Sequence, residues 1–390
     1  MFRGIRMARE FSFETKCIYG TKTVQTKADK SGALSMPIYQ TASFAHPGVG
    51  QSTGYDYTRT KNPTRENVED VVNALEGGVG GLAFSSGMSA VVCVMSLFGN
   101  GDHIIATDDL YGGSVRLFDN VSSASGITVT YHDTSDIKEI EEHIIHNTKA
   151  IFLETPSNPT MKVTDIAAVV EVAHKHNILV IVDNTFLTPY YQRPLELGAD
   201  IVIHSGTKYL GGHNDTLAGF AVCADIEIYN KLKWFQNTCG LSLAPFDSFL
   251  ITRGIKTLPI RMDRAQENAF KIVDFLKNHP KVKDVLYVGD ESHPSYEISK
   301  RQASGFGAMI SFRVDSKDTA IHLLENIRVA NYAESLGGTE TLITYPMLQT
   351  HGDVPVEIRE KLGITDTFLR MSVGIENVAD LIADLEQALG

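Results

Sequence analysis

The chain has 390 residues, 43% hydrophobic and 21% charged, which is typical of a globular protein with roughly two domains. Its 35 Lys and Arg stand against 47 Asp and Glu, and this net charge of −12 argues against a nucleic-acid-binding surface and favours small-molecule partners. No apolar stretch has the length of a membrane span, and none follows the basic N-terminus as in a signal peptide, so we expect a cytoplasmic protein with no membrane partner.

The first expected element is an extended N-terminal arm over residues 1–60. Residues 31–65 are rich in Gly, Pro, Thr and Tyr, which predicts mostly extended loop. Such a segment is free to reach a neighbouring subunit.

Helix-like and strand-like stretches then alternate over residues 61–256. A helix is expected at 67–78, and the expected strands include HIIAT (103–107), AIFLET (150–155), ILVIVDN (178–184) and ADIVIHS (199–205). This alternation predicts a large α/β domain with a parallel or mixed sheet covered by helices. The pattern changes near Lys256, where a long helix at 261–279 leads into shorter strands and helices. A smaller C-terminal α+β domain is therefore expected over residues 257–390.

The sequence HSGTKYLGGH carries the strongest chemical signal. An apolar strand runs into Ser205, Thr207 and Lys208, and two glycines follow shortly after. An amine that forms a Schiff base must be partly desolvated, and the two hydroxyls are suited to binding a phosphate. Taken alone, Lys208 also fits a solvated lysine in a glycine turn.

Two further motifs favour a bound cofactor with a phosphate and a pyridine ring. Asp183 follows the strand 178–182, at the sheet edge where α/β proteins bind ligands, and a carboxylate there would keep a pyridine nitrogen protonated. Ser86 and Gly87 open a helix whose free N–H groups suit a phosphate. Both motifs have a structural alternative, because Asp and Ser are also common helix N-caps.

These motifs belong to a longer series: YDYTRTKNPTR, FSSGMSA, DDLYGGS, ETPSNP, VDNTF, HSGTKYLGGHND, AESLGG and LRMSVGIE. Along essentially its whole length the chain resembles the transsulfuration (Cys/Met metabolism) family of fold type I pyridoxal-phosphate enzymes, in which these segments occur in the same order. The family includes cystathionine γ-synthase, cystathionine γ- and β-lyases and methionine γ-lyase. The resemblance implies the fold type I transferase fold, pyridoxal 5'-phosphate bound by residues 61–256, and a homotetramer, a dimer of dimers with shared active sites.

The resemblance also implies roles for the matched residues. Lys208, as the Schiff-base lysine, and Tyr111 would be catalytic. The cofactor would be bound by Tyr57, Arg59, Gly87, Met88, Tyr111, Asp183, Thr185, Ser205, Thr207 and Lys208. The substrate would be bound by Asn158, Glu334, Ser335 and Arg370.

Two of these roles depend mainly on the resemblance. Tyr57 and Arg59, on the arm, would reach the cofactor phosphate of the neighbouring subunit, whereas Arg59 taken alone would be a surface charge. Arg370 would clamp the substrate carboxylate, whereas an arginine on an apolar strand is more often a partnered structural residue.

Smaller sequence features narrow the range of possible amino-acid substrates. Gly113 stands where methionine γ-lyases usually carry a cysteine, Glu334 resembles a glutamate of the cystathionine-handling members, and residues 343–355 look most like bacterial γ-synthases. We expect γ-replacement on an activated homoserine with cysteine, as in a γ-synthase, ahead of cleavage as in a γ-lyase. The β-lyase follows closely, methionine γ-lyase is less favoured, and an aminotransferase is disfavoured by the SLGG and THGDVP segments.

No metal site is expected. Cys17, Cys93, Cys223 and Cys239 are scattered without a CxxC pair, so we expect reduced thiols. His174 and His176 are two apart on an expected helix and do not face each other.

Overall fold

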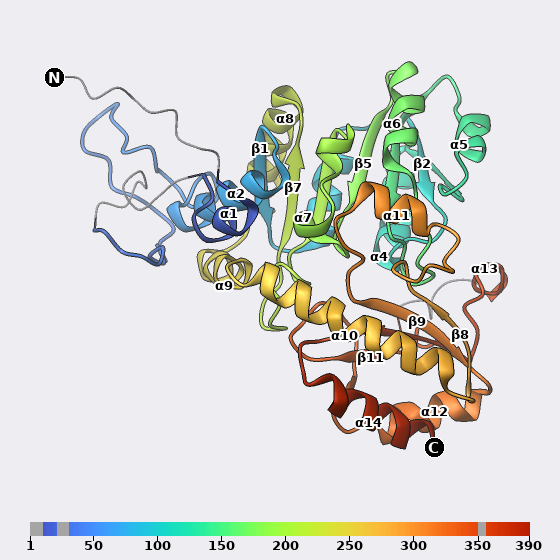
Figure 1. The fold of residues 1–390 in the computed structure, drawn as a ribbon. Coiled ribbons are helices and arrows are strands. Elements are labelled where there is room, and N and C mark those ends of the chain that lie inside the picture. The colour runs from blue at the N-terminus through green and yellow to red at the C-terminus, as the bar shows by residue number, and fades with distance from the viewer. Residues whose placement is uncertain (1–10, 22–30, 350–355) are drawn as a thin grey trace.

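The computed structural model describes residues 11–21, 31–349 and 356–390 (Figure 1). Within them the chain forms a seven-stranded sheet and a five-stranded sheet flanked by helices, which confirms the expected α/β class. Among these residues no helix combines the length and the apolar character that a membrane crossing requires. The THGDVP segment (350–355) lies outside the described residues, as do parts of the expected arm.

The larger sheet has the strand order β1-β7-β6-β5-β4-β2-β3. Its neighbours are parallel except at β7, which is antiparallel to both β1 and β6, so the sheet is mixed. The strands are β1 Gly80–Phe84, β2 His103–Thr107, β3 Thr128–His132, β4 Thr148–Glu154, β5 Leu179–Asp183, β6 Ile201–Ser205 and β7 Gly219–Cys223.

Helices cover both faces of this sheet, because its strands are apolar on both sides. Ile104 packs in the core under α3 and α8, whereas its neighbour Ile105 packs on the opposite face under α5 and α6. The helices of this part are α2 Pro63–Glu76, α3 Gly87–Met95, α4 Gly112–Arg116, α5 Ile137–His143, α6 Ile166–Lys175, α7 Thr188–Tyr191, α8 Ile226–Cys239 and α9 Pro245–Ile255, with short helical turns at Leu117–Ser122, Ser123–Ser125 and Pro194–Leu197.

The smaller sheet has the order β10-β11-β12-β9-β8 and is antiparallel except between β10 and β11. Its strands are β8 Val282–Leu286, β9 Met309–Val314, β10 Asn331–Tyr332, β11 Leu342–Thr344 and β12 Phe368–Ser372. Its helices are α10 Leu258–Asn278, α11 Tyr296–Gln302, α12 Lys317–Asn326, α13 Val356–Lys361 and α14 Val378–Leu389. The long helix α10 runs from α9, below the larger sheet, to the smaller sheet (Figure 1).

The N-terminal segment differs in one respect from the extended arm that was expected. Phe13–Tyr19 form the helix α1, because Cys17 on this helix is buried against Val68 and Val71 of α2. Residues 31–62 are loops with an isolated bridge between Ser43 and Tyr57. Figure 1 shows this segment, in blue, extending away from both sheets.

Acidic residues gather at one edge of the larger sheet. Glu154 and Asp183 are the last residues of the paired strands β4 and β5, and Asp108 and Asp109 directly follow β2. The carboxyl ends of parallel strands meet at the same edge, where open α/β sheets bind their ligands. Ser205 ends β6 at that edge and leads into Lys208.

The contribution of the smaller sheet's apolar core to the stability of the protein can be tested at one residue. Phe312 on β9 is fully buried in that core. We expect Phe312→Ala to lower the free energy of unfolding by roughly 3–5 kcal/mol, because it removes buried apolar surface and leaves a cavity. Denaturant unfolding measures this change, and Phe312→Leu should cost clearly less. Equal losses of unfolding free energy in the two variants would contradict the burial of the Phe312 ring in this core.

Candidate active site

A pocket of about 220 Å³ opens where the carboxyl edge of the larger sheet faces the smaller sheet. Twelve of the fourteen expected site residues line it: Gly87, Met88, Tyr111, Asn158, Asp183, Thr185, Ser205, Thr207, Lys208, Glu334, Ser335 and Arg370. The pocket is also lined by Ser86, Val91, Ser114, Glu154, Phe186, Leu217 and Leu336. Tyr57 and Arg59 are not among its lining residues.

Lys208 lies in the turn after β6, and its side chain enters the pocket. Its Nζ donates a hydrogen bond to Ser335 Oγ at 2.7 Å. Burial lowers the pKa of Lys208 to about 8; the charge of Arg370 lowers it too, whereas Glu334 raises it. At pH 7 about a tenth of the amine is therefore neutral and able to attack a carbonyl, far more than for an ordinary lysine.

Asp183 presents a fixed carboxylate at the end of β5. Its Oδ1 accepts hydrogen bonds from the Thr185 N–H at 3.0 Å and from Thr185 Oγ1. Thr185 Oγ1 in turn accepts from the Ser205 N–H at 2.8 Å, so β5 and β6 are joined at this point. Burial raises the pKa of Asp183, and the bonds from Thr185 counter part of that effect. A cationic ring nitrogen would favour the ionised form.

Glu154 is a pocket residue to which the sequence analysis assigned no role. It ends β4 beside Asp183, and its Oε2 accepts from the Tyr111 N–H at 2.9 Å. Burial raises the pKa of Glu154 well above its usual value, and the nearby Asp183 adds to the rise. The signal was in the sequence, since Glu154 ends an apolar strand just as Asp183 does.

The N-terminus of α3 lies next to the turn that carries Lys208. Ser86 caps this helix by accepting from the Ser89 N–H. A Cβ on Gly87 would lie 3.0 Å from Ser205 Cβ, so glycine permits the close approach of the two segments. The start of α3 thus lines the pocket together with Ser205 and Thr207, and a helix N-terminus beside two hydroxyl residues is suited to a phosphate.

Arg370 reaches the pocket from β12 of the smaller sheet. Its Nη1 donates to Asn158 Oδ1 at 2.7 Å, and its Nη2 donates to Ser335 O and to Thr344 Oγ1. Burial lowers the pKa of Arg370 to about 10, a value at which it remains charged at neutral pH. Its Nε has no hydrogen-bond partner among the described residues. A buried guanidinium with a spare donor suits a carboxylate ligand.

Tyr111 lines the pocket beside α3 and is partly exposed. The position of its ring requires Gly113, because a Cβ there would lie 2.4 Å from the ring atom Cε1 of Tyr111. A larger residue at position 113 would displace the ring.

The two expected residues outside the pocket lie on the loop segment 31–62. Arg59 Nη1 donates to Asn237 O at 2.6 Å, and its guanidinium lies 5.6 Å from the centre of the Tyr57 ring. The structure therefore does not bring them to the pocket of their own chain.

Comparison with known proteins links this chain to one class of enzymes. A family model described as "Cys/Met metabolism PLP-dependent enzyme" matches residues 14–390. A cystathionine gamma-lyase of Bacillus subtilis is 50% identical, over 93% of this chain and 96% of the relative. A cystathionine beta-lyase of Lactococcus lactis is 46% identical, over 97% and 99%. The solved cystathionine gamma synthase of Xanthomonas oryzae in complex with cystathionine superposes with a TM-score of 0.94 at 38% identity, over 97% of this chain and 98% of that one.

The lowered pKa of Lys208 predicts how the pocket reacts with an aldehyde. In protein stripped of pyridoxal phosphate, the rate of cofactor capture should rise with pH to a plateau, with a midpoint near pH 8, because only the neutral amine attacks. Since the Glu334 charge raises this pKa, Glu334→Gln should move the midpoint to lower pH. Stopped-flow absorbance measures the rate, and Glu334→Asp is the matched control. A midpoint above pH 10 in the unmodified protein would contradict the desolvation of Lys208.

Proposed function

Because the chain belongs to the Cys/Met metabolism family of PLP-dependent enzymes, we propose that it acts on the Cγ–S bond of cystathionine, with Lys208 as the residue that binds the cofactor. Pyridoxal-phosphate-dependent carbon–sulfur chemistry on amino acids is the activity of this family, and the fold is its fold type I architecture. The observation that carries the proposal is the placement of Lys208, Asp183, Arg370 and Glu334 around one pocket.

The residues of the pocket fit pyridoxal 5'-phosphate. Lys208 supplies a buried amine of lowered pKa for the aldehyde. Donors for the phosphate would come from Gly87 and Met88 in the first turn of α3, and from Ser205 and Thr207 at the end of β6 and in the turn after it. Asp183, held by Thr185, would meet the ring nitrogen, and Tyr111 would cover one face of the ring.

The bound cofactor supplies an electron sink that accepts the electrons left on the substrate when a proton is lost. Arg370, held by Asn158, binds the α-carboxylate and fixes the orientation of the amino acid. With the cofactor and substrate bound, the Nζ of Lys208 would take the α-proton, and Ser335 Oγ holds this amine in place. Tyr111 serves as a second proton-transfer group near the reacting carbons.

Our first choice is the cleavage of cystathionine, which is the reaction of a γ-lyase. The Bacillus subtilis relative at 50% identity is named a γ-lyase, and Glu334 offers the pocket a carboxylate for the distal ammonium of cystathionine. The synthase direction is the second candidate, because the γ-synthase solved with cystathionine has nearly the same fold. Gly113 disfavours a methionine γ-lyase, in which a cysteine usually follows the tyrosine-glycine pair.

We also propose a quaternary arrangement, a domain division and a location. Residues 1–60 would act as an arm that carries Tyr57 and Arg59 to the cofactor phosphate of a neighbouring subunit, since both residues lie outside the pocket of their own chain. Residues 61–256 would form the cofactor domain and residues 257–390 the smaller domain. The assembly would be a cytoplasmic homotetramer with small-molecule amino-acid substrates.

Product analysis tests the proposed activity. With cystathionine, purified holoenzyme should release cysteine and 2-oxobutyrate. Homocysteine with pyruvate would instead identify a β-lyase, and new cystathionine from an activated homoserine and cysteine would identify a synthase. Lys208→Ala should lower turnover by at least about a thousandfold, because it removes the proton-transferring amine. An active Lys208→Ala variant, or no product from any of these substrates, would refute the proposal.

The shared site is tested with mixed subunits. We expect Arg59→Ala to weaken pyridoxal-phosphate binding roughly 10- to 100-fold, because a charge-assisted contact is lost. At a pyridoxal-phosphate concentration too low to saturate Arg59→Ala, coexpressed Arg59→Ala and Lys208→Ala subunits should show activity that neither variant has alone, since each hybrid pair contains one intact site. Turnover and absorbance of the bound cofactor are the measurements. Hybrids without activity would show that Arg59 does not act across subunits.

A further inference from the structure

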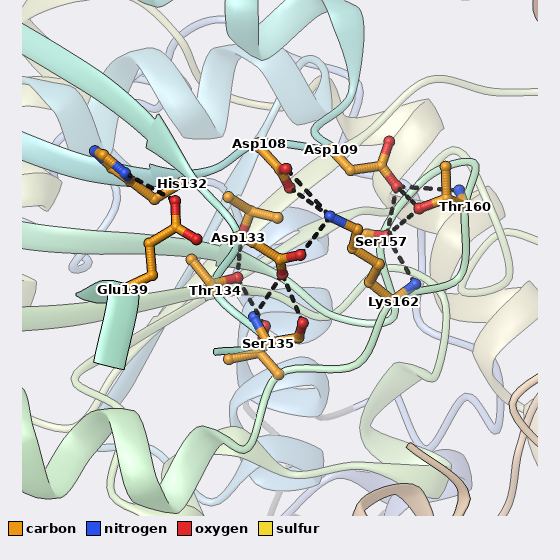
Figure 2. Close-up of polar contacts among 12 residues, drawn as sticks. Asp108, Asp109, His132, Asp133, Thr134, Ser135, Glu139, Ser157, Thr160 and Lys162 are labelled. Atoms are coloured by element: carbon orange, nitrogen blue, oxygen red, sulfur yellow. Dashed lines mark hydrogen bonds and ion pairs between the residues drawn. The ribbon is translucent and has the colours of Figure 1, made fainter. Parts of the chain in front are cut away.

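A buried carboxylate outside the pocket joins two of the segments that form it. Asp109, the second residue after β2, is fully buried and does not line the pocket. Its Oδ2 accepts three hydrogen bonds, from Ser157 Oγ at 2.5 Å, from the Thr160 N–H at 3.0 Å and from Thr160 Oγ1 (Figure 2). Asp109 Oδ1 has no hydrogen-bond partner among the residues that the structure describes.

The turn that Asp109 holds carries Asn158, the partner of Arg370. Asn158 lies between Ser157 and Thr160, the two residues that donate to Asp109, and its Oδ1 accepts from Arg370 Nη1. The smaller sheet holds the same turn from the other side, because Ser311 Oγ donates to Pro159 O at 2.7 Å. The turn is therefore fixed between Asp109 and the sheet that carries Arg370.

The far end of the turn is fixed by a separate ion-pair network. The N–H of Lys162 donates to Ser157 Oγ at 3.0 Å, and its Nζ contacts Asp108 at 3.1 Å and Asp133 at 2.7 Å (Figure 2). Asp133 lies at the outer, partly exposed end of this network. Asp109 makes no bond to the Lys162 Nζ, so its contacts are confined to residues 157–160, next to Asn158.

Asp109 is also close in sequence to the other side of the pocket. Tyr111 is two residues further along the chain, and its N–H donates to Glu154 Oε2. The segment that carries Tyr111 and the turn that carries Asn158 are thus held together by the side chain of Asp109.

Simple packing does not account for a carboxylate at this position. Burial raises the pKa of Asp109 because the charged form loses hydration, and one of its oxygens is unpartnered. A buried charge without a directly bonded cation is costly, and an apolar residue of similar size would avoid that cost. An apolar residue, however, could not accept hydrogen bonds from two hydroxyls and one N–H, as Asp109 does.

We propose that Asp109 is a positioning residue for substrate recognition: it holds the 157–160 turn so that Asn158 directs the Arg370 guanidinium at the α-carboxylate of the substrate. The inference rests on the proposed carboxylate-binding role of Arg370. Its consequence is specific, since loss of Asp109 should weaken the binding of amino acids much more than the binding of the cofactor.

Asp109→Asn tests this role with little change in shape. The amide oxygen replaces a charged acceptor, so the bonds to the turn weaken while the side chain keeps its volume. In the holoenzyme we expect glycine, followed by the absorbance of the bound cofactor, to bind at least about tenfold more weakly, and KM for cystathionine to rise more than kcat falls. Methylamine, which has the amine but no carboxylate, should bind as it does to the unmodified enzyme. Glu139→Gln, which changes a carboxylate that contacts only His132 among the residues drawn in Figure 2, should leave the affinities for glycine and methylamine within about twofold.

Two further variants keep the test valid if Asp109→Asn folds poorly. Ser157→Ala and Thr160→Val each remove one donor to Asp109 and should each weaken glycine binding while methylamine binding is unchanged. The inference would be overturned if the binding of glycine and the binding of methylamine weakened equally. It would also be overturned if none of the three variants changed the affinity for glycine. If the unmodified enzyme does not bind pyridoxal phosphate, the proposed function itself has failed, and the two outcomes are therefore distinguishable.

Discussion

Two basic side chains, the buried Arg370 and the partly buried Lys208, line the same pocket, and the arrangement around them depends on how their charges are compensated. Arg370 lowers the pKa of Lys208, whereas Glu334 raises it, and burial of both cations adds the cost of lost hydration. The carboxylates of Glu154 and Asp183 line the same pocket, at the ends of adjacent strands. The protein thus keeps a neutralisable amine close to a permanently charged guanidinium, which is the combination that a carbonyl cofactor and a carboxylate substrate require.

The pocket exists only where the two sheets meet. Lys208 lies in the turn after β6 of the larger sheet, whereas its hydrogen-bond partner Ser335 lies between β10 and β11 and Arg370 lies on β12 of the smaller sheet. The helix α10 joins these parts, and its buried Arg261 donates to Tyr209 O, next to Lys208, and to Gly254 O before the helix. The turn after Lys208 is thereby held by the same helix that packs on the smaller sheet.

Much of the fold followed from local pattern, because apolar strands that end in acidic or hydroxyl residues are read directly from the chain. The expected strands at 103–107, 178–184 and 199–205 correspond to β2, β5 and β6, and the helix expected at 261–279 is α10. The helix α1 was not expected, since its stability comes from the burial of Cys17 against α2 and not from its own short sequence. The antiparallel direction of β7 was likewise a consequence of chain connectivity that residue patterns do not encode.

The sequence alone determined the chemistry at single positions: a lysine after an apolar strand, an aspartate at the end of another, and a serine-glycine helix start. These features are local, because each depends on residues adjacent in the chain. The tertiary structure decided which groups act on one another over long distances in sequence, such as Arg370 on Asn158 and Asp109 on the 157–160 turn. It also decided the pKa of Lys208, because desolvation depends on the walls that both sheets build around the amine, and no local pattern reports that burial.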